Sequence, residues 1–119
     1  MKRAIFLLLA WATAARCDII PIVFFEPGSA ELGPKAIMMI REAVVAAPRA
    51  EHANVTGYCD PDEHAVAGLC PALARRRAEA VRAVLVARGV TARIKVRTSN
   101  ELLDPCNPAG NRRVTIDLF

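Results

Sequence analysis

The alternation of short β-branched runs with two longer helical segments restricts the possible folds more than any other feature of this sequence. Four segments have strand patterns, being rich in β-branched residues or alternating between apolar and polar side chains: 19–25, 52–58, 91–97 and 113–119. A helix is predicted from Pro34, because proline at a first helical position loses no hydrogen bond, to about Pro48. A second helix is predicted from Pro71 to a stop at Gly89. The resulting order β-α-β-α-β-β predicts one α+β domain over 19–119, with two helices on a sheet and parallel strand pairs joined by right-handed crossovers.

The first residues are typical of an export signal. A basic start is followed by the apolar run 4–11 and by small residues at 12–15, so we expect a signal peptide over 1–14, with cleavage as late as residue 16. A lipid anchor on Cys17 is the alternative, and it is the less favoured one because Arg16 stands where a lipoprotein signal needs a small residue.

Charge and cysteine content restrict the class of partner and the compartment. Loss of the signal removes two of the 16 basic residues and leaves 14 against 12 acidic ones, a net charge of +2, so no nucleic-acid partner is expected. An exported chain reaches an oxidising compartment, where its cysteines are expected to form disulfides. Three pairings are open to the four candidates, which are Cys17, Cys59, Cys70 and Cys106.

A cluster of polar residues at 59–64 contains side chains of the kinds that bind zinc or catalyse reactions. It lacks the paired C-x2-C or H-x3-H spacing of a structural zinc site, so we expect no metal. No catalytic or phosphate-binding motif accompanies the Cys59 and His64 pair, so we expect neither an enzyme nor a cofactor.

Arg77 has an unusual position on the second predicted helix. It lies four residues from both Leu73 and Val81, on or beside the apolar side of that helix. An arginine there needs a carboxylate or a ligand, and Asp60 at the end of the preceding strand is a suitable partner. Two interpretations remain open, a structural salt bridge between Asp60 and Arg77 or a ligand site to which both contribute.

Four blocks of the sequence resemble the signatures of the OmpA-like C-terminal domain family. They are 23–32, 55–60, 73–81 and 111–114, in that order along nearly all of the chain that follows the signal. The resemblance implies a mixed sheet with two helices packed on one face. It also implies non-covalent binding of peptidoglycan in the periplasm of a bacterial envelope, with an association with the outer membrane as a further possibility.

The resemblance also implies which residues bind. In this family an aspartate and an arginine recognise the diaminopimelate residue of the stem peptide, and they correspond to Asp60 and Arg77 here. A free diaminopimelate end carries an ammonium and a carboxylate, to which an aspartate and an arginine are complementary. Phe25, Gly28 and Ser29 are expected to frame the pocket.

From the last strand, Arg112 or Arg113 is expected to contribute to the same pocket, although a surface role is at least as well supported for either arginine.

Two departures from the family pattern affect this expectation. Cys59 and Cys70 stand where the family has threonine and asparagine, and a disulfide between them would explain both replacements. Cys17 and Cys106 then remain as a second candidate pair. Loss of two polar contacts leaves an alternative function, a structural or protein-interaction domain that no longer binds peptidoglycan.

Overall fold

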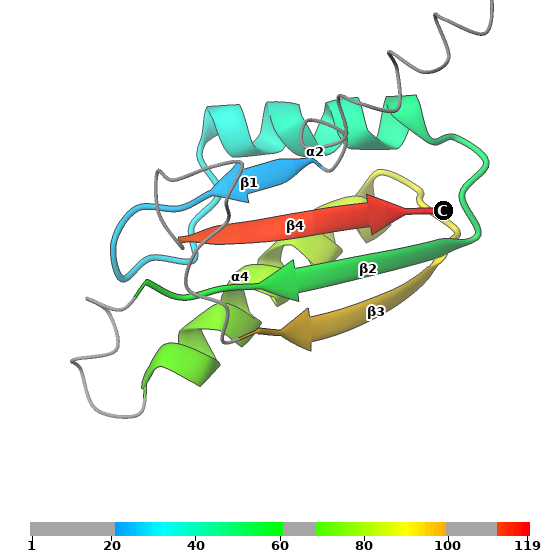
Figure 1. Cartoon of the computed structure of the whole chain (residues 1–119). Helices are drawn as coiled ribbons and strands as arrows, with labels where there is room; N and C mark the ends of the chain where they lie inside the picture. The colour runs from blue at the N-terminus through cyan, green and yellow to red at the C-terminus, as the bar shows by residue number, and fades with distance from the viewer. Residues whose placement is uncertain (1–20, 61–68, 100–111) are drawn as a thin grey trace, which may run out of the picture.

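The computed structural model describes residues 21–60, 69–99 and 112–119. These residues form six elements, coloured along the chain in Figure 1: β1 (Ile22–Phe24), α2 (Pro34–Ala46), β2 (His52–Gly57), α4 (Leu69–Ala87), β3 (Arg93–Thr98) and β4 (Arg113–Leu118). The order is the β-α-β-α-β-β predicted from the sequence. None of the helices in these ranges is long and apolar enough to cross a membrane. The expected signal segment lies outside the described residues.

The sheet is mixed, with strand order β1-β4-β2-β3. β2 and β3 pair in parallel, as the intervening helix predicts, and β4 pairs antiparallel with both β1 and β2 (Figure 1). β1 and β2 therefore run in the same direction without being neighbours, because the last strand of the chain lies between them.

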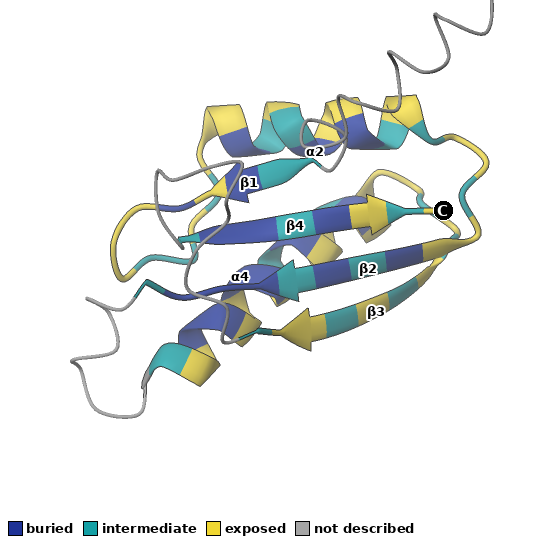
Figure 2. Cartoon of the chain, in the orientation of Figure 1, coloured by how far each residue is buried: buried dark blue, intermediate teal, exposed yellow. Residues whose placement is uncertain are grey.

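Both helices cover one face of the sheet, and the core lies between the two layers (Figure 2). Alternate strand residues point into it, since successive side chains of a strand face opposite sides. Aliphatic side chains of both layers dominate the core, which contains Val23, Ile40, Val55, Val81, Leu85, Val114 and Ile116, all wholly buried. The opposite face of the sheet, called the open face below, carries mostly polar side chains.

Element boundaries differ slightly from the expected ones. β1 is shorter than 19–25 and begins after Pro21, which has no N–H to donate to a ladder. α4 begins at Leu69, so Pro71 is its third residue, still within the first turn where no N–H is needed. Gly89 has φ +82° and Val90 N–H donates to Leu85 O at 3.1 Å, which confirms the predicted helix stop.

Gly57, the last residue of β2, permits a very close approach of α4. A Cβ atom built at this position would lie 1.9 Å from the carbonyl oxygen of Ala74 and 3.3 Å from Cβ of Ala78. A glycine is therefore required by space, not by backbone angles. The approach brings the next turn of α4, which carries Arg77, against the end of β2.

We predict that Gly57→Ala destabilises the fold by about 2 to 3 kcal/mol, because the new methyl group collides with helix backbone that cannot move aside locally. The midpoint of urea unfolding measures the change. Gly33→Ala is the matched control, since nothing lies within 4 Å of a Cβ at that position, and it should cost under about 1 kcal/mol. Equal midpoints for the two variants would contradict the proposed packing constraint.

Candidate functional site

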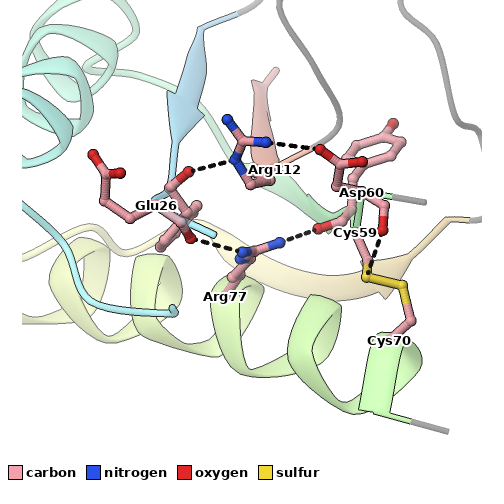
Figure 3. A network of polar contacts seen from close by, with 8 residues as sticks. Glu26, Cys59, Asp60, Cys70, Arg77 and Arg112 are labelled. Atoms are coloured by element: carbon pink, nitrogen blue, oxygen red, sulfur yellow. Dashed lines mark hydrogen bonds and ion pairs between the residues drawn. A yellow bond between two sulfur atoms is a disulfide. The ribbon is translucent and has the colours of Figure 1, made fainter. Parts of the chain in front are cut away.

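Arg77 lies at the centre of a polar network between α4 and the loop after β1. Its side chain is completely buried, with 0% exposure. Nε donates to Ser29 O at 2.8 Å. Nη1 donates to Tyr58 O at 3.1 Å and Nη2 to Glu26 O at 3.1 Å (Figure 3). One guanidinium thus joins two segments that are far apart in the sequence. The inward direction predicted for Arg77 is confirmed.

The surroundings of Arg77 explain how a charged group can be buried there. The N–H groups of Arg77 donate to backbone carbonyl oxygens that lie in the directions set by the planar guanidinium. Its Cζ atom also lies 5.3 Å from the ring centroid of Phe25, which is 6% exposed, so the ring face adds a cation–π contact. A buried charge is tolerated when its hydrogen bonds are satisfied in this way.

The turn at 26–29 provides two of the three carbonyl acceptors. Ser29 N–H donates to Glu26 O at 3.1 Å, which closes the turn, and Gly28 adopts φ +70°, a conformation that favours glycine. Ser29 Oγ accepts the N–H of Glu31 at 3.0 Å. Phe25, Gly28 and Ser29, all predicted from the sequence as pocket residues, are therefore brought together around Arg77.

The Asp60 carboxylate forms an ion pair with Arg112, the residue immediately before β4. Arg112 Nη1 donates to Asp60 Oδ2 at 2.7 Å, and Arg112 Nε donates to Phe25 O at 3.3 Å (Figure 3). Phe25 N–H returns a bond to Arg112 O at 2.8 Å. The side chains of Asp60 and Arg112 are 15% and 33% exposed, so this ion pair is the accessible part of the network.

The Asp60–Arg112 pair could not be identified from the sequence. The sequence offered Asp60 and Arg77 either as a salt bridge or as joint contributors to a ligand site, and Arg112 as one of several further contributors. The pair depends on the insertion of β4 between β1 and β2, which local patterns do not encode. The adjacent Arg113 has a separate role, since its Cζ lies 3.9 Å from the ring centroid of Tyr58 and its side chain is buried.

A disulfide joins Cys59, beside Asp60, to Cys70 in the first turn of α4 (Figure 3). The two Cα atoms are 5.7 Å apart. Cys59 is buried against Leu73 and Ala74, so the bridge also belongs to a small apolar cluster next to the network. Cys17 and Cys106 lie outside the described residues, and their pairing stays a prediction.

The described residues contain no group of three or more side chains that could hold a metal ion. Most of the acidic and imidazole cluster considered from the sequence, including His64, lies outside the described ranges. Chemically, the described network offers one partly exposed carboxylate beside a partly exposed guanidinium, with a second, buried guanidinium behind the turn.

We predict that Arg77→Lys destabilises the fold by about 3 kcal/mol, because one ammonium cannot reach all three carbonyl oxygens and hydrogen bonds of this largely buried network are lost. Unfolding in urea measures the loss. Arg76→Lys, at an exposed position on the same helix, should change stability by less than about 0.5 kcal/mol. An unchanged midpoint for Arg77→Lys would show that the fork geometry is unimportant.

The disulfide should contribute about 2 to 3 kcal/mol, because closing a loop of this length restricts the unfolded chain. The double variant Cys59→Ala/Cys70→Ala, compared with wild type under oxidising conditions, should lose that amount in urea unfolding. Peptide mapping without reductant provides an independent check, and recovery of Cys59 as a free thiol would contradict the linkage.

Comparison with solved structures shows several similar folds. The peptidoglycan-associated lipoprotein of Burkholderia pseudomallei superposes with TM-score 0.65 at 22% identity, over 83% of this chain and 90% of that one. The C-terminal domain of Helicobacter pylori MotB gives 0.62 at 22% identity, over 82% and 81% of the two chains. The OmpA-like domain of FopA1 from Francisella tularensis gives 0.60 at 20% identity, over 80% and 68%.

Comparison with curated protein sequences gave no match. The family model of the OmpA family matches residues 24–114, a range that contains both helices, β2 and β3 in full and reaches from the end of β1 to the start of β4. The network of Arg77, Asp60 and Arg112 lies within that range. A match over most of the sequence shows that the chain belongs to the OmpA family.

Proposed function

We propose that this protein binds peptidoglycan non-covalently, in the periplasm of a bacterial envelope, through the surface formed by Asp60 and Arg112. The observation that carries the proposal is the partly exposed ion pair of these two residues, fixed at the edge of the buried Arg77 network. Membership of the OmpA family supports it. A solved structure with the same fold also belongs to a lipoprotein described as peptidoglycan-associated.

The ligand group that best matches this surface is the free end of diaminopimelate, which presents an ammonium and a carboxylate on one carbon. The Asp60 carboxylate would bind the ammonium, and the Arg112 guanidinium would bind the carboxylate through its planar fork. Each ligand charge then replaces part of the existing ion pair, so neither protein charge is left without a partner.

Arg77 is proposed to act mainly as a positioning residue. Its guanidinium is completely buried and donates to three carbonyl oxygens. It therefore holds Phe25, the turn at 26–29 and the end of β2 in one arrangement around the surface pair. A direct contact between Arg77 and a ligand carboxylate, as the family resemblance implies, would require the buried guanidinium to become accessible.

The two cysteine replacements are compatible with this proposal. The Cys59 side chain is 5% exposed and packs against α4, so the residue at this position is directed away from the exposed pair. The disulfide restricts the backbone of Cys59, the residue before Asp60. A backbone that is already ordered loses less conformational entropy when a ligand binds.

Sedimentation with purified sacculi tests the proposal. Wild type should sediment with diaminopimelate-containing sacculi, and Asp60→Asn should bind about tenfold or more weakly, because an amide cannot neutralise the ligand ammonium. Asp117→Asn, an exposed carboxylate on β4, is the matched control and should bind like wild type. Circular dichroism should show that both variants remain folded.

Three outcomes would contradict different parts of this proposal. Wild type that remains in the supernatant would exclude peptidoglycan binding and favour the alternative, a domain that binds other proteins. Undiminished binding of Asp60→Asn would exclude this surface. Equal binding to sacculi whose stem peptides carry lysine, which lacks the second carboxylate, would exclude recognition of diaminopimelate.

A further inference from the structure

β3 lies at one edge of the sheet, and the backbone groups on its outer side pair with none of the described strands. Among the four described strands it pairs with β2 alone. Arg93 N–H donates to Glu51 O at 2.8 Å and Ser99 N–H to Gly57 O at 3.1 Å, so in this parallel ladder the odd-numbered residues face β2. Ile94, Val96 and Thr98 therefore direct their N–H and C=O groups outward. These groups can form a further ladder with an added strand.

The open face of β3 carries a row of positive charge. Arg93, Lys95 and Arg97 are exposed, project from alternate positions, and are spaced by about 6.6 Å as in any parallel strand. None of the three forms an ion pair with any residue that the structure describes. Their partners in register on β2, His52, Asn54 and Thr56, provide no carboxylate, which leaves the positive charges uncompensated on that side.

The surface beside this row is hollowed, with a volume of about 380 Å³. Besides the three cations, its lining includes Asn54 of β2 and the stacked rings of His52 and Phe119, whose centroids are 5.4 Å apart. The hollow leaves space for side chains that approach Arg93, Lys95 and Arg97 from the open face.

The opposite side of β3 is apolar. Ile94 and Val96 point toward the helices, are half-buried, and pack against the main core. Figure 2 shows that burial decreases from the central strands to β3 at the sheet edge. Apolar side chains from an added strand would extend the core layer here, so β3 offers an apolar side and a cationic side in strict alternation.

We infer that the outer edge of β3 binds an extended segment of a partner polypeptide in which acidic residues alternate with apolar ones. The backbone of that segment pairs with Ile94, Val96 and Thr98, its acidic side chains lie beside Arg93, Lys95 and Arg97, and its apolar side chains cover the core edge. A second copy of this chain is disfavoured as the occupant, because pairing two β3 edges would place cations opposite cations.

Basic residues also occur on edge strands simply to prevent pairing. That role predicts that no strand binds at all, whereas the proposed role predicts selectivity for an acidic one. The three cations of the row stand in register with His52, Asn54 and Thr56 of β2, and none of them forms a hydrogen bond or ion pair with the described network of Asp60, Arg77 and Arg112. The inference therefore does not depend on the peptidoglycan surface.

Fluorescence anisotropy with the purified protein tests this inference. The probe is a short labelled peptide with blocked ends that alternates glutamate and valine. One control is the same peptide with lysine in place of glutamate. Two further controls are N-methylated at every second backbone amide, one at the odd-numbered and the other at the even-numbered positions of the peptide. We expect the acidic peptide to bind, the lysine peptide not to bind, and one N-methylated version to bind about tenfold or more weakly, because it cannot donate to β3.

Variants of the protein complete the test. Lys95→Glu should weaken binding of the acidic peptide by about tenfold, whereas Lys35→Glu, an exposed charge reversal on α2, should leave it unchanged. Absence of binding would overturn the inference and leave the cations with a protective role. Equal binding of both N-methylated versions, with displacement by polyphosphate, would also overturn it by identifying a general polyanion surface.

Discussion

The hydrogen bonds of the Arg77 guanidinium hold the functional end of this domain together. Its three acceptors lie 19, 48 and 51 residues away along the chain, on the loop after β1 and at the end of β2. The carbonyl of the buried Tyr58 receives its donor from this guanidinium, and a buried carbonyl without a donor is costly in a folded protein. One side chain therefore links the turn at 26–29 directly to the end of β2.

Gly57 and Arg77 work as a pair. The absence of a side chain at Gly57 allows α4 to approach β2 closely. That close approach brings the Arg77 guanidinium within hydrogen-bond distance of the carbonyl at the end of β2. Asp60 and Arg112 then sit on backbone that this contact fixes, and the disulfide from Cys59 to Cys70 secures the same corner covalently. The exposed ion pair is thus supported by buried contacts from three directions, which is how a surface site becomes pre-organised.

Local signals in the sequence predicted the elements well and the contacts between them incompletely. Proline and glycine marked both helices, and the apolar side of α4 placed Arg77 inward, because these features depend on neighbouring residues. The three carbonyl acceptors of Arg77 were not predicted, since backbone carbonyls have no residue-type signature. The pairing of Asp60 with Arg112 was missed for a different reason. It requires β4 to lie between β1 and β2, and strand order is decided by packing across the whole chain.

The central position of β4 also restricts the order in which the protein can fold. Residues of β1 pair with Arg113, Val114 and Thr115, close to the C-terminal end of the sequence. β1 and the inner edge of β2 have no strand partner until residues 113–118 are in place. The parallel pair of β2 and β3 with α4 can form from nearer contacts, so the sheet closes last at its middle. A long-range closure of this kind makes folding slower than local contacts alone would allow.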